Sequence, residues 1–367
     1  MSNEIVLNTI QHILRVVVGT EFAKGFALQL SGREDEFWQR LFLFAKSQGV
    51  LAIVFDGLMQ LFEADKEFAK AFPQALKFKW INAVFNIEQR YEQQLRLSAE
   101  LAGKWAEQGI RTFCLKGLAI SSYYPEPTHR ECGDLDCFLP DNYERGNIIA
   151  EECGAKVERD FYKHSHISYK GLMVENHQFC TPIRGAKQYK QRERYLQSLL
   201  ATSNPQYIGN TKLIRPSCDF NALFLTTHSF GHFLTEGIRL RHILDWALFV
   251  KAEQGNIDWE NFYAWCDKLG YTRFVNALNA IAVDYLGLDF CNKVVVDRAL
   301  SERILHDVLY GGVSIFNQNM PKWRVRLAIV KSYMNSIWKY HKVYRRSVFV
   351  ELMRVVGGFL FERTPKL

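Results

Sequence analysis

Apolar residues recur at intervals of three and four positions through the first hundred residues, most clearly in segments 37–45 and 51–59. This spacing puts the apolar side chains on one face of an α-helix. Segment 82–108 has no proline and is rich in Glu, Gln, Arg, Leu and Ala, which favour helix formation. We therefore expect a helical N-terminal region over residues 1–108.

The pattern changes between residues 110 and 182, where short β-like runs are separated by Gly, Pro and Asp. The runs alternate with short helical stretches, so they predict a small α/β core over residues 109–187. The expected elements are strands over 111–115, 134–139 and 155–159, a short helix over 118–124, and a hairpin of 164–169 and 172–180 that turns at Lys170-Gly171.

Beyond about residue 188 the helical pattern returns, with a loop expected around 203–209. We expect residues 188–320 to form a helical domain that completes a cleft with the core. Residues 321–367 are expected to form a basic helical C-terminal segment. The predicted fold class is therefore α+β, with helical regions on both sides of a small sheet.

Composition excludes several classes of protein. Apolar residues make up 48% of the 367 residues and aromatic residues 14%, which excludes a disordered or low-complexity chain. The eight cysteines show no C-x-x-C spacing, so we expect reduced thiols and no thiolate zinc site. No apolar run approaches the roughly 18 residues of a membrane span, and we expect a cytoplasmic protein without a signal peptide.

Positive charge is concentrated at one end of the chain. Segment 321–367 holds eleven Lys or Arg against two Glu, a balance of +9, whereas the whole chain carries +7. Interleaved with aromatic residues, these charges could bind a nucleic-acid backbone or another anionic partner. The alternative is a solvated face of terminal helices.

Two aspartates form the most informative local pattern. Asp134 and Asp136 alternate with Leu135 and Cys137, so on a strand both carboxylates project from the same face. Two close carboxylates repel each other unless a cation neutralises them, and Mg²⁺ prefers oxygen ligands of this kind. Taken alone, the pair is more typical of a solvated turn that binds nothing.

Two further features favour a phosphate-handling site. Lys116-Gly117 lies between a predicted strand and a predicted helix, where backbone N–H groups could bind phosphate oxygens. Lys116 could alternatively end its strand in solvent. Glu175, on the second strand of the predicted hairpin, is the third carboxylate expected to meet Asp134 and Asp136. Such a trio suits two-metal phosphoryl or nucleotidyl chemistry.

These residues make the sequence resemble the bacterial nucleotidyltransferases of the DNA polymerase β superfamily. The resemblance lies in a branch with Leu-Lys-Gly before Arg-x-x-Gly-Asp-x-Asp, matched here by segments 115–117 and 130–136. A hydrophobic-Glu-x-His strand follows at 174–177, and a His-x-x-x-His pair and a hydrophobic-Asp follow at 228–232 and 244–245. The motifs occur in the family's order and cover about residues 110–250.

The resemblance implies a polymerase β-like mixed sheet and a function: transfer of a nucleoside monophosphate from an NTP to an acceptor hydroxyl by two-metal displacement with Mg²⁺ or Mn²⁺. Glu175 is also a candidate base for the acceptor proton. One departure is Gly117-Leu118, where the superfamily usually has Gly-Ser or Gly-Gly. The implied metal ligands and catalytic residues are Asp134, Asp136 and Glu175, and the implied nucleotide-binding residues are Lys116, Gly117, Arg130, Gly133 and Ser121.

Several residues allow more than one interpretation. Arg130 could hold a phosphate or fix the loop before Asp134. His177 is expected to point to the other face of its strand from Glu175 and to pack or bond a loop. The candidate cleft residues are His228, His232, Arg239, Arg241 and Asp245. The two histidines could bind zinc, contact acceptor or nucleotide, or join helices, and the arginines could form surface ion pairs.

Three functions follow from these patterns. The first is a nucleotidyltransferase that modifies a small molecule, a protein or an RNA end. The second is an RNA-directed transferase that docks RNA on segment 321–367. The third is a non-catalytic module that keeps the fold and binds a nucleotide or a partner protein. The expected partners are an NTP and an acceptor, with no membrane, and the sequence predicts no oligomeric state.

Overall fold

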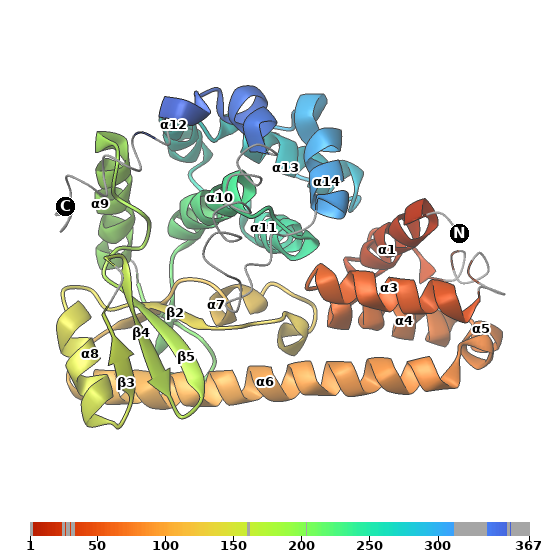
Figure 1. Ribbon diagram of the computed structural model, residues 1–367, viewed down its shortest axis with the longest axis horizontal. Helices are drawn as coiled ribbons and strands as arrows, with labels where there is room; N and C mark the ends of the chain where they lie inside the picture. The colour runs from red at the N-terminus through yellow and green to blue at the C-terminus, as the bar shows by residue number, and fades with distance from the viewer. Residues whose placement is uncertain are drawn as a thin grey trace, which may run out of the picture.

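The computed structural model describes residues 3–23, 26, 30, 34–159, 162–202, 204–311, 336–350 and 353. It is an α+β structure in which helices surround a seven-stranded mixed sheet, as predicted (Figure 1). None of the helices in these ranges combines the length and apolar composition needed to cross a membrane. All eight cysteines are free thiols.

The sheet has the strand order β3-β4-β5-β2-β1-β7-β6. β5 runs parallel to β2 and β7 runs parallel to β1, whereas the other neighbouring pairs are antiparallel. The strands are β1 (Thr112–Cys114), β2 (Leu135–Phe138), β3 (Lys156–Glu158), β4 (His164–Tyr169), β5 (Leu172–His177), β6 (Gln206–Tyr207) and β7 (Leu213–Arg215).

The five strands predicted between residues 111 and 180 are all present. The hairpin turns at Lys170 and Gly171, whose φ angles of 49° and 86° match the turn type that suits a two-residue hairpin. The loop expected around 203–209 instead contains β6, and β7 follows it. These strands have two and three residues, too short for a recognisable alternation.

The helices before the sheet form a group of their own beside α6 (Figure 1). α6 begins at Gln74, directly after Pro73 and earlier than predicted, and its 34 residues span roughly 50 Å at 1.5 Å per residue. It therefore passes beneath both the N-terminal helices and the sheet. These helices are α1 (Asn3–Val17), α3 (Asp35–Ser47), α4 (Leu51–Ala64), α5 (Lys66–Ala71) and α6 (Gln74–Glu107).

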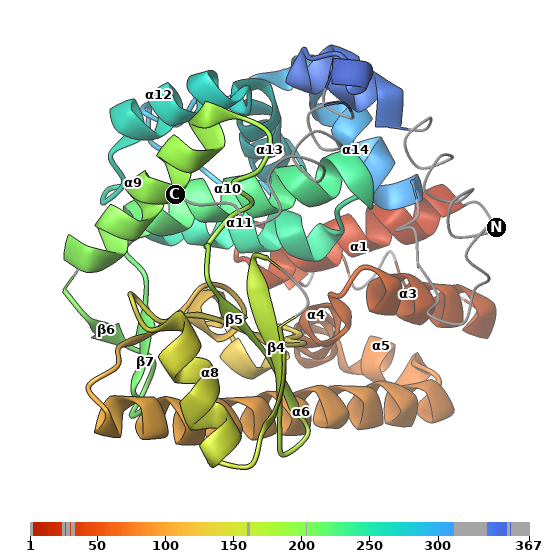
Figure 2. The ribbon, with the colours of Figure 1, turned by 60° about the vertical axis from the view of Figure 1, so that its left-hand side comes forward.

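Within and after the sheet the chain forms the remaining helices. α10 and α11 lie over the sheet, on the side away from α6 (Figures 1 and 2). Most of segment 321–367 lies outside the described residues. The helices are α7 (Leu118–Ser121), η1 (Pro127–His129), α8 (Tyr143–Glu152), α9 (Lys187–Thr202), α10 (Cys218–Thr235), α11 (Leu240–Glu253), α12 (Trp259–Leu269), α13 (Thr272–Asp284), η2 (Arg298–Leu300), α14 (Ser301–Tyr310) and the π-helix η3 (Lys339–Tyr344).

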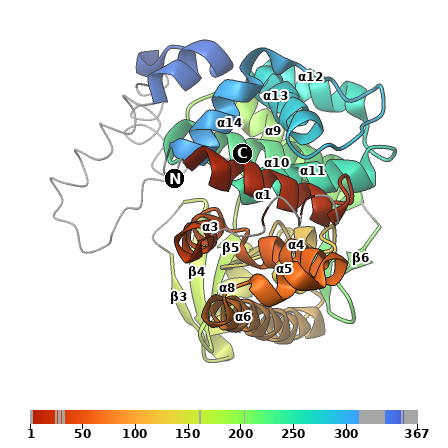
Figure 3. The same cartoon turned by 90° about the vertical axis from the view of Figure 1, so that its right-hand side faces the viewer.

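α1 joins the N-terminal helices to the later ones. It packs on α4, and Figure 3 shows it between α3 and α4 on one side and the later helices on the other. Arg15 donates hydrogen bonds to the carbonyl oxygens of Asp284 and Tyr285, at 2.7 and 3.0 Å. The N-terminal region and the end of α13 are therefore in direct contact.

The two faces of the sheet differ in chemistry because side chains alternate along each strand. Leu135, Cys137, Ile167 and Val174 are buried on the face that packs with side chains of α6. Asn176 lies on the same face, where its amide donates to the backbone oxygen of Tyr143 and the side-chain oxygen of Asn147. The opposite face, beneath α10, carries the ionisable residues.

Candidate active site

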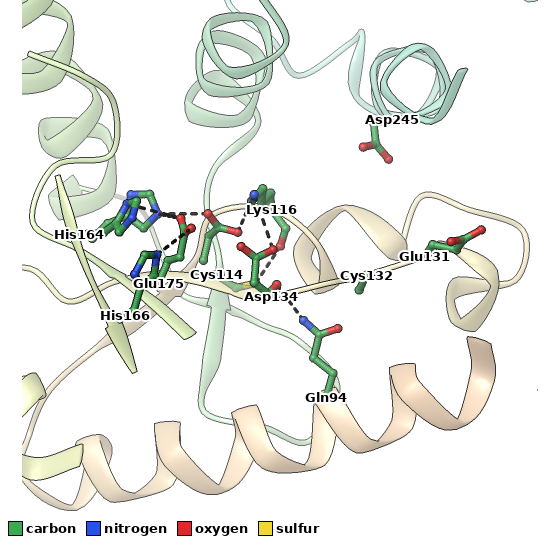
Figure 4. A network of polar contacts seen from close by, with 12 residues as sticks. Gln94, Cys114, Lys116, Glu131, Cys132, Asp134, His164, His166, Glu175 and Asp245 are labelled. Carbon is green, nitrogen blue, oxygen red and sulfur yellow. Dashed lines mark hydrogen bonds and ion pairs between the residues drawn. The ribbon is translucent and has the colours of Figure 1, made fainter. Parts of the chain in front are cut away.

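The pairing of β2 with β5 brings the three predicted carboxylates together. Asp136 and Glu175 are direct partners in the parallel register, and Asp134 immediately precedes β2. One carboxylate oxygen from each residue lies within 4.8 Å of the others. Figure 4 shows Asp134 and Glu175 pointing into the same space. The three side chains form one acidic cluster, which we call the carboxylate trio.

Lys116 points at the carboxylate trio and does not end its strand in solvent. Its Nζ lies 3.0 Å from Oδ2 of Asp136 and 3.8 Å from Oδ1 of Asp134 (Figure 4). Burial alone would lower the pKa of Lys116, but the adjacent Asp136 and Asp134 carboxylates outweigh it and raise that pKa. The side chain therefore stays cationic and partly neutralises the trio.

The three carboxyl groups are not electrostatically equivalent. Burial and the neighbouring Asp136 raise the pKa of Asp134. Burial would also raise the pKa of Asp136, but Lys116 and His177 lower it well below its usual range. Burial would raise the pKa of Glu175 too, but the hydrogen bond from His177 and the nearby His164 and His177 rings together lower it. Asp136 and Glu175 are therefore ionised at neutral pH, and their carboxylates can accept hydrogen bonds or bind a cation.

The predicted orientation of His177 is wrong. Residues two apart on a strand point to the same face, so His177 projects beside Glu175. Its Nε2 lies 3.1 Å from Oδ1 of Asp136 and 3.3 Å from Oε2 of Glu175. Its Nδ1 donates to the backbone oxygen of Phe179 at 3.1 Å. His177 thus belongs to the site as well as holding the chain after β5.

β4 adds two histidines that the sequence analysis did not single out. Nδ1 of His164 lies 3.5 Å from Oε2 of Glu175, and Nε2 of His166 lies 3.7 Å from Oε1 (Figure 4). The sequence did contain a signal for these two residues. His164 and His166 are two positions apart, so on a strand both rings lie on the same face. The partner strand was needed to show which face that is.

A cavity of about 420 Å³ opens above these residues, beneath α10. This volume lies within the range of roughly 300–1,000 Å³ typical of small-molecule sites. Lys163 is a second lysine in its lining and was also missed by the sequence analysis. Burial lowers the pKa of Lys163. The cavity is lined by the carboxylate trio, Lys116, Lys163, His164, His177, His228, His232 and neighbouring residues of α10.

Arg130 and Asp245 bind each other. Arg130 donates from Nε and Nη2 to the two carboxylate oxygens of Asp245, at 2.9 and 2.8 Å. Tyr124 donates to the same carboxylate at 2.7 Å, and Arg130 also donates to the backbone oxygen of Glu131. Of the two predicted roles for Arg130, this geometry favours fixing the loop before Asp134.

Ser121 lines neither the cavity over the carboxylate trio nor the smaller one beside it. Its side chain is buried, its Oγ donates to the backbone oxygen of Leu118 at 2.9 Å, and it lies 2.8 Å from the Tyr91 hydroxyl on α6. Gly117 and Gly133 line a second, smaller cavity of about 60 Å³ next to Lys116. Gly117 has a φ of +62°, which side chains rarely adopt, and helix α7 after it has only four residues.

Of the remaining cleft candidates, His228, His232 and Arg241 line the two cavities and Arg239 lines neither. His228 lines both, and its ring centroid lies 4.5 Å from that of His232. These two histidines belong to no metal-binding group of three among the described residues. Arg241 lines the smaller cavity and donates to the backbone oxygen of Glu131, whereas Arg239 precedes α11 and lines neither cavity.

Helix α6 supports the site from below. The side-chain amide of Gln94 donates to the backbone oxygen of Asp134 at 2.9 Å (Figure 4). Gln94 is buried, so this bond fixes the chain where β2 begins. The sequence contained no signal for this contact, because a single Gln in a Gln-rich helix is not distinctive.

The fold and the site define an α+β protein in which a mixed sheet presents acidic residues to a cavity lined by two lysines. This arrangement is consistent with a nucleotidyltransferase core. A family model described as uncharacterised nucleotidyltransferase matches residues 34–287, more than half of the chain. The chain therefore belongs to this nucleotidyltransferase family. No curated protein and no solved structure gave a significant match.

Proposed function

We propose that the chain transfers a nucleoside monophosphate from an NTP to an acceptor hydroxyl, with Mg²⁺ or Mn²⁺ held by Asp134, Asp136 and Glu175. The observation that carries this proposal is the convergence of these carboxylates within 4.8 Å at the floor of a cavity. The motifs 115–117 and 130–136 further support placing the chain in the Leu-Lys-Gly branch of the family.

The donor set fits such ions. Mg²⁺ prefers carboxylate and water oxygens, and the trio offers carboxylates from two adjacent strands. Bound there, a pair of ions would stabilise the attacking and leaving oxygens of an in-line displacement. Lys116 contacts the same carboxylates and is long enough to turn to a phosphate instead. Lys163, in the same cavity lining, supplies a second cation for the triphosphate.

Incubation with each α-labelled NTP, Mg²⁺ or Mn²⁺ and cell extract tests this function. We expect label to enter an acceptor with the wild type and not with Asp134→Asn/Asp136→Asn. Glu158→Gln is the matched control, since Glu158 lies exposed on β3 of the same sheet and should leave labelling unchanged. Label in a metabolite, in protein or in RNA identifies the acceptor class, and label in RNA would favour an RNA-directed transferase.

The second candidate is a non-catalytic nucleotide-binding module. The ion pair of Lys116 with Asp136 favours it, because a protein cation then occupies the position of a metal. In this case no NTP labels an acceptor, yet nucleotide binding measured by calorimetry persists. Label transfer by the wild type therefore separates the two candidates, whereas Lys116→Gln should weaken nucleotide binding under either.

A further inference from the structure

Three adjacent strands present a second pattern on the face that carries the carboxylate trio. In the antiparallel register of β4 and β5, His164 pairs with His177 and His166 pairs with Glu175. The alternation of side chains puts all four on one face, next to Asp136 on β2. Three imidazoles and one carboxylate therefore share this face, and His164, His177 and Glu175 among them line the cavity.

The distances among these groups match those between ligands of one metal ion. Oε2 of Glu175 lies 3.3 Å from Nε2 of His177 and 3.5 Å from Nδ1 of His164. One ligand atom from each of the three residues lies within 4.8 Å of the others. Two ligands each 2.0–2.1 Å from a tetrahedral zinc are roughly 3.4 Å apart.

His177 is also held as a metal-ligating histidine is held. Such histidines usually donate the second ring N–H to a carbonyl or carboxylate, which fixes the ring and directs the other nitrogen at the metal. Here Nδ1 donates to the backbone oxygen of Phe179, so Nε2 faces the carboxylates of Asp136 and Glu175. The ring is 1% exposed, and its orientation is therefore set before any ion binds.

We propose that His164, Glu175 and His177 form a binding site for a divalent transition metal of the zinc class, distinct from the oxygen-only trio but sharing Glu175 with it. Imidazole nitrogen suits zinc-class ions, whereas Mg²⁺ prefers oxygen ligands. Three protein ligands leave a coordination position open toward the cavity that they line. A role of this ion in nucleotidyl transfer rests on the proposed function, but its binding does not.

The alternative is that the imidazoles only bond the carboxylates. Nε2 of His177 lies close enough to donate to Asp136, at 3.1 Å. Under this alternative the protein would bind divalent ions only through the oxygens of the trio, and His164→Gln would leave the affinity for Zn²⁺ unchanged. The two possibilities therefore differ in the ligand atoms that coordinate the metal and in the effect of replacing His164.

Metal binding to the full-length protein, stripped with a chelator and without nucleotide, tests the proposal. We expect one equivalent of Zn²⁺ or Co²⁺ to bind in preference to Mg²⁺, and bound Co²⁺ to show the visible absorption of a nitrogen-containing site. His164→Gln should lower the affinity for Zn²⁺ by more than the roughly 10–100-fold typical of losing an outer-shell partner. His166→Gln is the matched control on the same strand face: it removes a contact with Glu175 but no proposed ligand, so it should lower the affinity by less than His164→Gln does.

Two results would overturn the proposal: no stoichiometric Zn²⁺ or Co²⁺ binding, or binding that His164→Gln leaves unchanged. Because His177 is buried and its variant could unfold, His164, whose side chain is 14% exposed, provides the deciding variant, with circular dichroism to verify its fold. Label transfer without zinc binding would refute only this proposal. Zinc binding without label transfer would refute only the proposed function.

Discussion

The buried ion pair between Arg130 and Asp245 permits a quantitative test of how the loop before Asp134 is held. Asp245→Ala would remove the acceptor of two hydrogen bonds from Arg130 and one from Tyr124. The guanidinium is 6% exposed, so the variant leaves a buried charge without its carboxylate. Breaking such a pair costs about 3–5 kcal/mol, and we expect a loss of this size in the free energy of unfolding.

Urea denaturation followed by circular dichroism measures this loss as a lower midpoint with an unchanged slope. The triple variant Arg130→Met/Asp245→Leu/Tyr124→Phe removes the three polar side chains of this group together and should recover most of the stability, because apolar replacements of a buried pair are often neutral. It should also keep its affinity for nucleotide. A loss below about 1 kcal/mol in Asp245→Ala, or abolished nucleotide binding in a stable triple variant, would refute a purely structural role for Arg130.

Three further predictions concern other parts of the fold. In Gly146→Ala the new Cβ would lie 2.1 Å from Cδ1 of Leu139, so we expect a loss of about 1–3 kcal/mol in thermal or urea unfolding. Ser121→Ala removes the contact with Tyr91 and should cost about 1 kcal/mol while leaving nucleotide affinity unchanged in calorimetry. Burial alone would lower the pKa of His129, but hydrogen bonds to two carboxylates raise it to about 9. Because the folded pKa exceeds the unfolded value near 6.5, the stabilisation is complete below about pH 6.5 and is lost as pH rises through 9. The stability difference between wild type and His129→Gln should therefore shrink over that range, and a constant difference would contradict this assignment.

Much of the fold followed from the sequence because its signals are local. Apolar spacing predicted the N-terminal helices, and punctuation by Gly, Pro and Asp predicted the five strands from β1 to β5. The short strands β6 and β7 were missed, since pairing of β7 with β1 depends on residues about a hundred positions apart. The division of the chain into four regions stays a prediction, although β7 lies in the sheet and comes from the region predicted to be helical.

The sequence by itself identified the acidic residues, because Asp-x-Asp and a later Glu on strand-like runs are visible without coordinates. Only the tertiary structure decided what surrounds them. The register of β4 against β5 placed His164 and His177 beside Glu175, and the docking of α11 paired Arg130 with Asp245. These contacts depend on which strands and helices become neighbours, and that choice is made by packing of the whole chain, which local patterns do not encode.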